Sequence, residues 1–175
     1  MTGFRDLPDS ALEQIALGLG PWTRCLRLAD RRAWLLLRDR RPPRLTLADA
    51  VRSVPLMRWA HRDGCSLNLM TCDAAAGGGR RDVLEWLRDN GCGWWEGTCA
   101  AAAAGGHLGA LEWLRERGCP WDERTCDHAA CCGHLDVLRW ARENGCQWDA
   151  RTLAYAERQG HAEVLEWARA NGCPE

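Results

Sequence analysis

Histidine and cysteine side chains at helical spacing are the first residues of this chain whose types could do chemistry. His128 is followed by Cys131 and Cys132, three and four residues later, and then by His134. Positions three and four residues apart share one face of a helix, so one helix would present two ligands to a zinc ion. A Cys-x-x-Cys ligand pair occurs nowhere in the chain, and both histidines follow a repeat described below. We therefore expect no metal site.

A catalytic role is the next question for the histidines, because His107, His134 and His161 recur at a constant spacing. No paired carboxylate and no nucleophile accompanies them, so they have no reacting partner to activate. The glycine triplet at 77–79 lacks both the preceding strand and the following Gly-Lys-Ser/Thr of a phosphate-binding loop. The sequence thus predicts no enzymatic activity, no catalytic residue and no cofactor.

Tryptophan marks a period of 27 residues, which the three histidines share. The tryptophans at this spacing, each five residues before a Gly-Cys pair, are Trp59, Trp86, Trp113, Trp140 and Trp167. A fixed period of this length is the signature of a repeat array, in which each unit buries its apolar face against its neighbours. We predict units at 44–70, 71–97, 98–124, 125–151 and 152–175, with this tryptophan ladder in their core.

Unit 98–124 shows the pattern of one repeat most clearly. Thr98 can cap a first helix through its hydroxyl, the alanines at 100–104 favour helix, and the glycines at 105–106 end it. A second helix follows, and Gly118 ends it. Its packing side carries, at helical spacing, Leu108, Leu111, Trp113 and Leu114. The sequence therefore predicts an all-α fold of paired antiparallel helices.

Three motifs of the repeat are similar to those of the ankyrin repeat. Residues 125–130, Thr-Cys-Asp-His-Ala-Ala, resemble that family's Thr-Pro-Leu-His-x-Ala-Ala opening, and residues 133–138, Gly-His-Leu-Asp-Val-Leu, resemble its Gly-His-Leu-x-Val-Val centre. The Gly-Cys-Pro-Trp-Asp of 118–122 is similar to its Gly-Ala-Asp-Val-Asn close. The resemblance covers 44–175 and implies an ankyrin-type solenoid of five helix-turn-helix repeats.

The chain departs from the family in the length of its period, which is usually about 33 residues. Most of the loss falls between Asp122 and Thr125, where the family's projecting hairpin lies, so we expect short loops. Cysteine also replaces the helix-opening proline at 72, 99 and 126. This short version, rich in Trp and Cys, resembles the ankyrin arrays of large DNA viruses and some lower eukaryotes.

Residues 1–43 do not follow the repeat, and they resemble an F-box, the helical module that binds the Skp adaptor of cullin-type ubiquitin ligases. The resemblance lies in the Leu-Pro opening, in Ile15 and Leu19 of a first helix, and in a close at 26–37. The family's mid-segment Asp-Leu is absent. The residues that the resemblance implies for adaptor binding are Leu7, Pro8, Leu12, Ile15, Leu19 and Trp34. The alternative is an amphipathic helical cap that covers the first repeat.

Charge and composition exclude several other classes of function. The net charge of −1 provides no bulk field for nucleic acid or membranes, and the longest aliphatic run, at 35–37, is too short to span a bilayer. No signal segment is visible, and eleven cysteines without one favour free thiols in a reducing compartment. We therefore expect a monomer that is not secreted and that lies in the cytoplasm or nucleus, of a host cell if the protein is viral.

The target-binding surface is predicted from the positions at which the units differ. The first helices carry mostly Ala, Gly and Cys, so specific contacts should fall on the loop positions. Trp95 differs most, because its equivalents are Asp122 and Asp149, and we expect it to be an exposed anchor. The alternative is that Trp95 folds onto Trp94. The predicted target-binding residues are Trp95, Asp122, Glu123, Asp127, Asp149 and Arg151.

These patterns indicate a protein-interaction function. The resemblances imply a substrate-receptor subunit of a cullin-type ubiquitin ligase, in which 1–43 docks the Skp-type adaptor and 44–175 holds an unknown protein target. The alternative is a plain ankyrin-repeat scaffold with no link to a ligase. All 23 basic residues are Arg, which either a GC-rich coding sequence or a ligase subunit that avoids modifying itself would explain.

Overall fold

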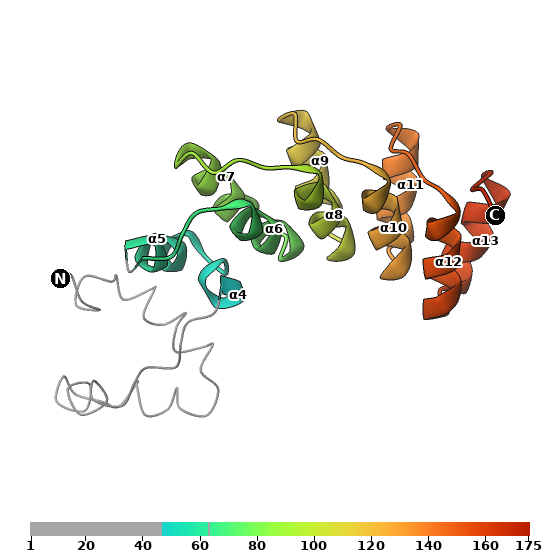
Figure 1. The fold of residues 1–175 in the computed structure, drawn as a ribbon, viewed down its shortest axis with the longest axis horizontal. Coiled ribbons are helices and arrows are strands. Elements are labelled where there is room, and N and C mark those ends of the chain that lie inside the picture. Colours follow the sequence, from blue (N-terminus) through green and yellow to red (C-terminus); the bar gives the residue numbers. More distant parts are fainter. Residues whose placement is uncertain (1–46, 63) are drawn as a thin grey trace, which may run out of the picture. The chain divides into compact units, whose positions relative to one another are not determined.

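The computed structural model describes residues 47–62 and 64–175 (Figure 1). No strand occurs in this part of the chain, so the predicted all-α fold class is confirmed for it. None of its helices is long and apolar enough to cross a membrane. The residues predicted to contact an adaptor lie outside the described part: Leu7, Pro8, Leu12, Ile15, Leu19 and Trp34.

The chain divides into two units, Met1–Cys65 and Ser66–Glu175, so the division falls within the predicted array and not at its start. The helices described in the first unit are α4 (Leu47–Ala50) and α5 (Val54–Arg62). The backbone N–H of Leu56 donates to the Ser53 hydroxyl at 3.4 Å, which caps α5. Pro55 lies in the first turn of α5, where a missing N–H leaves no helical bond unmade.

The second unit is a row of helix pairs, each with two or three residues between its first and its second helix. The first helices are α6 (Leu69–Gly77), α8 (Glu96–Ala104), α10 (Glu123–Cys131) and α12 (Ala150–Gln159). The second helices are α7 (Arg81–Asp89), α9 (Leu108–Glu116), α11 (Leu135–Glu143) and α13 (Ala162–Ala170). Each first helix packs against the next first helix and against its own second helix (Figure 1).

Small side chains allow the first helices to lie close together. Ala75, Ala102 and Ala129 occupy equivalent positions in successive repeats, and each is completely buried. Alanine also favours helix and loses no side-chain entropy on burial. The first helices therefore pack tightly against one another.

The second helices supply the larger apolar groups of the core. Leu84, Leu111 and Leu138 are equivalent to one another and completely buried. The tryptophan in each connection packs edge-to-face on the tryptophan of the next second helix, in the pairs Trp94–Trp113, Trp121–Trp140 and Trp148–Trp167, each with ring centroids 5.8 Å apart. Such a pair contributes about 0.5–1.5 kcal/mol beyond its buried area.

Among the ladder residues whose side chains the structure describes, only Trp113 lies fully in the core, at 2% exposed, and the side chain of Trp59 lies outside that description. Trp86, Trp140 and Trp167 are half-buried. They lie on second helices, and these helices do not pack on one another as the first helices do. Each of these side chains therefore stays partly accessible.

The first helices begin three residues earlier than their threonines predict. α8 starts at Glu96, so Thr98 is its third residue and Trp95 is the N-cap. In α10 and α12 the N-caps are Asp122 and Asp149, whose carboxylates accept from the backbone N–H two positions later, at 3.2 and 2.8 Å. Aspartate is a stronger N-cap than threonine. The threonine hydroxyls are thereby left for other bonds.

A histidine of the next repeat holds each of two connections between first and second helices. Nε2 of His134 lies 3.1 Å from the carbonyl oxygen of Ala104, and Nε2 of His161 lies 3.0 Å from that of Cys131. The His134 ring is so close to Gly106 that a Cβ there would lie 2.6 Å from it. Gly106 has φ of +70°, a conformation that glycine adopts without strain. His134 and His161 thus have a structural role at these connections.

We predict that Gly106→Ala destabilises the protein more than Gly118→Ala does. Both glycines have positive φ, so each alanine costs about 1–2 kcal/mol of backbone strain. Only Gly106 has the histidine ring against it, because nothing lies within 4 Å of a Cβ at Gly118. Displacing that ring also breaks its hydrogen bond, for about a further 1 kcal/mol. Urea unfolding of both variants measures the difference, and equal losses would contradict the histidine contact.

Candidate functional site at the N-terminal ends of the first helices

Five of the six residues predicted to bind a target lie at the start of a first helix. With two neighbours they form what we term the N-terminal edge: Trp95, Glu96, Asp122, Glu123, Arg124, Asp149 and Arg151. The sixth, Asp127, lies in the second turn of α10 and is only 2% exposed. The expectation that Asp127 is available to a partner is therefore wrong, because its carboxylate is used inside the fold.

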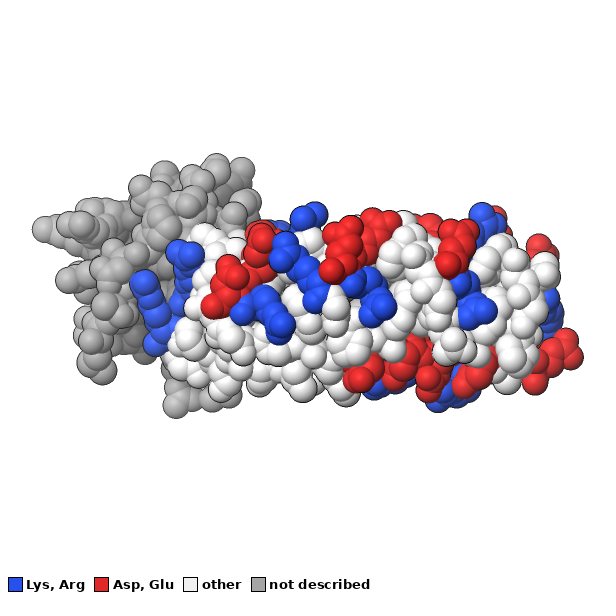
Figure 2. Space-filling model, turned by 90° about the horizontal axis from the view of Figure 1, so that it is seen from above, with Lys and Arg blue, Asp and Glu red and all other residues white. Residues whose placement is uncertain are grey.

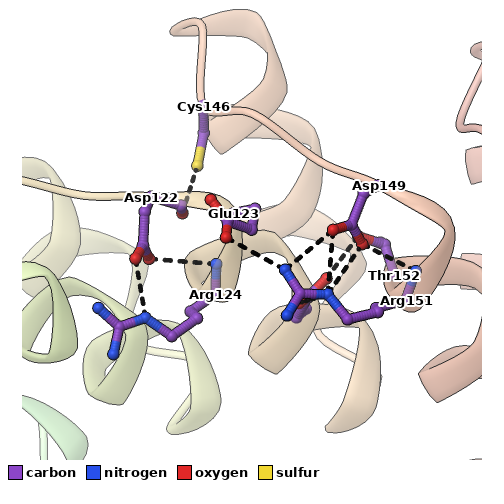
Figure 3. A network of polar contacts seen from close by, with 8 residues as sticks. Asp122, Glu123, Arg124, Cys146, Asp149, Arg151 and Thr152 are labelled. Atoms are coloured by element: carbon purple, nitrogen blue, oxygen red, sulfur yellow. Dashed lines mark hydrogen bonds and ion pairs between the residues drawn. The ribbon is translucent and has the colours of Figure 1, made fainter.

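Arg151 is the centre of an ion-pair network that joins α10 to α12 (Figure 3). Its Nη2 lies 3.1 Å from Oε1 of Glu123 and 2.9 Å from Oδ2 of Asp149, and its Nε lies 3.6 Å from Oδ2 of Asp127. The hydrogen bond from Arg151 lowers the pKa of Asp149. Hydrogen bonds to Asp149 and Glu123 in turn raise the pKa of Arg151. The network is therefore charged at neutral pH, although water screens its exposed pairs.

Arg124 makes the same kind of link one repeat earlier. Its Nε donates to Oδ2 of Asp122 at 2.8 Å, and its Nη2 lies 4.0 Å from Oε2 of Glu96. Its Cζ also lies 5.1 Å from the centroid of the Trp95 ring, within cation–π range. Arg124 and Arg151 therefore each connect the N-cap aspartate of their own helix to the preceding first helix.

Trp95 is half-buried, so the prediction that it is exposed is wrong. Its indole N–H donates to the carboxylate of Asp73 on α6, with 3.0 Å to each oxygen. Its ring lies over Gly97, where a Cβ would be only 2.5 Å from it. Trp94, the alternative partner, packs on Trp113 instead. Trp95 therefore links α6 to α8.

Gly97 is the sequence signal that would have revealed this arrangement. Its equivalents are Arg124 and Arg151, so the Asp-x-Arg of the later repeats is Trp-x-Gly here. The indole of Trp95 lies over Gly97 and occupies the space where the side chain of an arginine at this position would begin. Like those two arginines, it bonds to an acidic side chain of the preceding first helix.

We predict that Gly97→Ala destabilises the protein by about 1–3 kcal/mol, because its Cβ forces the indole away from Asp73. The double variant Trp95→Asp/Gly97→Arg replaces both residues with the pair used by the later repeats, and it should recover most of that loss. Denaturant unfolding measures both. A double variant no more stable than Gly97→Ala would show that the two positions are not coupled.

Threonine hydroxyls bond to aspartates across two of the repeat boundaries. Oγ1 of Thr98 donates to Oδ1 of Asp73 at 2.8 Å, and Oγ1 of Thr152 donates to Oδ1 of Asp127 at 2.7 Å. Burial raises the pKa of Asp127, and the bond from Thr152 opposes that shift. These bonds hold neighbouring first helices in register.

The boundary between these two lacks the bond. Ala100 stands where the aspartate would be, and the hydroxyl of Thr125 is buried without a hydrogen-bond partner among the described residues. Its polar neighbour is the Cys146 thiol, a weak hydrogen-bonding group. The molecule thus contains two equivalent threonines, of which Thr152 makes a hydrogen bond to a carboxylate and Thr125 does not.

This pair gives a matched test of the hydrogen bond. We predict that Thr152→Val costs about 1.5–3 kcal/mol, because it leaves the buried Asp127 carboxylate without its donor. Thr125→Val should change stability by less than about 0.5 kcal/mol, because no carboxylate lies opposite it. Thermal or urea unfolding compares the two. Equal losses would mean that the methyl packing, not the hydroxyl, decides the effect.

Cysteine thiols form buried pairs between positions that are not equivalent in the repeat. Sγ of Cys72 lies 2.9 Å from Sγ of Cys92 in the same repeat. One repeat later, the hydrogen bond to Cys119, together with burial, raises the pKa of Cys99. A thiol whose pKa is raised in this way stays protonated at neutral pH and is a poor nucleophile. In the last repeat Leu153 replaces the first thiol and packs near Cys173.

The possible zinc ligands do not gather into a site. His128 and Cys132 are exposed, whereas Cys131 is half-buried and its carbonyl accepts the bond from His161. Within residues 47–62 and 64–175, no three metal-ligating side chains lie close enough together to hold an ion.

The charge of the region around the N-terminal edge is acidic on balance. Two guanidinium groups, of Arg124 and Arg151, face six carboxylates: Asp73, Glu96, Asp122, Glu123, Asp127 and Asp149. Negative charge is favourable here because it lies at helix N-termini. Charged side chains of both signs gather along two edges of the face in Figure 2, with uncharged surface between them.

Comparison with known proteins gives no relative from which a function could be carried over. No protein-family model matches this chain, and no curated protein matches it. Its function therefore has to be argued from its own residues.

Proposed function

We propose that this chain is a protein-interaction module, an ankyrin-type array that binds a protein target along its N-terminal edge. The observation that carries the proposal is where the repeats differ. The buried positions of the first helices keep small residues, whereas the edge changes from Trp-x-Gly to Asp-x-Arg along the row. A surface that varies on a constant scaffold is how repeat proteins recognise partners.

The charge of the edge defines the kind of target. The four carboxylates of the edge against its two guanidiniums favour a partner with a basic surface, so association should be fast and should weaken as salt rises. Trp95 offers one half-buried aromatic face, but Arg124 already lies over its ring. Contacts at the edge are therefore mainly electrostatic.

We further propose that residues 1–43 dock a Skp-type adaptor, which would make the chain a substrate receptor of a cullin-type ubiquitin ligase. The support is the Leu7-Pro8 opening, the apolar spacing that follows it and the absence of Lys from the whole chain. A plain ankyrin-type scaffold without the adaptor is the second candidate. The array and its N-terminal edge serve either function.

One binding experiment separates the two functions. The full chain is mixed with purified Skp-type adaptor, and we predict a complex that Leu7→Ala/Pro8→Ala weakens at least tenfold, because apolar burial is lost. The matched control is Trp95→Asp/Gly97→Arg, which alters the target surface and should leave adaptor binding unchanged. A wild-type chain that does not bind the adaptor would leave only the scaffold function.

A further inference from the structure

A groove lies between α9 and α11. The equivalent positions between α7 and α9 and between α11 and α13, which we call the flanking grooves by analogy, differ from it in their residues. Its volume is about 480 Å³, and its walls are Glu112, Arg115, Glu116, Trp121, Trp140 and Asn144. It lies among the second helices and so includes no residue of the N-terminal edge. Because the array repeats every 27 residues, the same positions can be compared in its neighbours.

In the preceding groove, between α7 and α9, an arginine of the chain itself covers the tryptophan. Cζ of Arg117 lies 4.5 Å from the ring centroid of Trp113, and its Nη2 lies 3.6 Å from Oε1 of Glu85. Cζ of Arg81 lies 5.6 Å from the same ring. The groove thus binds a guanidinium through one aromatic face and one carboxylate.

In the following groove, between α11 and α13, an arginine again lies against the tryptophan. Cζ of Arg139 lies 5.7 Å from the ring centroid of Trp167. Arg139 takes the position that Glu85 and Glu112 occupy in the other two grooves. Both flanking grooves therefore contain an internal cation.

The middle groove keeps the aromatic ring and the carboxylate, but no described guanidinium lies over that ring. Asn144 stands where Arg117 stands one repeat earlier, and its Nδ2 donates to the backbone carbonyl of Trp140 at 2.9 Å. In the described part of the chain, no guanidinium lies over the half-buried Trp140, and the half-buried Glu112 makes no ion pair. Arg115 is already used, because it hydrogen-bonds the Cys119 carbonyl and lies over Trp121.

We propose that this groove binds an arginine side chain of a partner protein. The guanidinium stacks on Trp140 and pairs with Glu112, as Arg117 does with Trp113 and Glu85. Glu116 adds a second carboxylate at the exposed end of the groove. Arginine fits better than lysine because a planar guanidinium stacks on an aromatic face while it pairs with a carboxylate. The proposal rests on the proposed function only in that the ligand belongs to a protein.

The test uses the full chain labelled with ¹⁵N and a short probe, the peptide acetyl-Gly-Arg-Gly-amide. The indole N–H signal of Trp140, identified by its loss in Trp140→Phe, should shift saturably, with a dissociation constant of about 1 mM. The matched peptide with lysine should bind at least about fivefold more weakly. A wild-type chain whose Trp140 signal does not respond, or responds equally to both peptides, overturns the proposal.

The repeat supplies variants that fill or open the grooves. Asn144→Arg places an internal guanidinium in the middle groove, as Arg117 does in its neighbour, and should abolish the shift. Arg81→Leu/Arg117→Asn gives the α7/α9 groove the residues of the middle one, and should add a second response at Trp113 and raise the stoichiometry from one to two. Binding that survives Asn144→Arg would contradict the proposal.

A third variant tests the ion pair with a substitution that keeps the size and shape of the side chain, so that a loss of binding does not reflect misfolding. Glu112→Gln changes one half-buried carboxylate to an isosteric amide and should weaken the peptide about tenfold; unchanged affinity would contradict the ion pair. None of these residues lies on the N-terminal edge or in 1–43. Failure of the arginine site would therefore leave adaptor and target binding intact, whereas failure of those two would leave the peptide response unchanged.

Discussion

Close packing of one first helix against the next is the constraint on which the rest of the second unit depends. Alanines that are completely buried at Ala75, Ala102 and Ala129 set the distance between neighbouring helices. Only at that distance can the Thr98 hydroxyl reach Asp73 and the His134 ring reach the Ala104 carbonyl. The same 27-residue step brings each connecting tryptophan onto the next second helix. The Thr–Asp bonds, the histidine bonds and the tryptophan pairs therefore all depend on the distance between neighbouring first helices.

The positions that break the period are the ones that distinguish one part of the surface from another. Trp95 with Gly97 replaces an Asp–Arg pair, and Asn144 replaces the Arg117 that fills the neighbouring groove. Each replacement leaves the backbone unchanged and alters what a partner would meet. In a repeat array the residues that recur in every unit maintain the fold, and the residues that differ between units are the candidates for partner recognition.

The helices and their phase could be predicted from sequence, because alanine runs, glycine stops and apolar spacing act locally. The details that failed depend on a neighbour one repeat away. The sequence pattern assigns an N-cap to Thr98, but its hydroxyl bonds to Asp73 on the preceding helix. The aspartates equivalent to Trp95 predict an exposed side chain, but the absence of a side chain at Gly97 leaves space for the indole to pack over it.

The sequence pattern also could not predict which charged side chain is buried, or which contacts join positions that are not equivalent in the repeat. Asp127 lies among polar residues in sequence, but packing of α10 against α12 encloses it beside Thr152. The contact of Cys72 with Cys92 joins positions 20 residues apart that no periodic comparison would pair. The open face of Trp140 depends on a side-chain position too, because the equivalent Trp113 is covered by the Arg117 guanidinium.

Removal of one whole period tests the account most directly. Deletion of residues 98–124 brings Thr125 opposite Asp73 and leaves every remaining interface of the repeat type. We predict a chain that still unfolds cooperatively in urea, with an m-value reduced in proportion to the lost surface. Deletion of about half a period, residues 98–111, should abolish cooperative unfolding because it breaks the phase. A full-period deletion that unfolds, or a half-period deletion that folds equally well, would contradict the dependence on a single spacing.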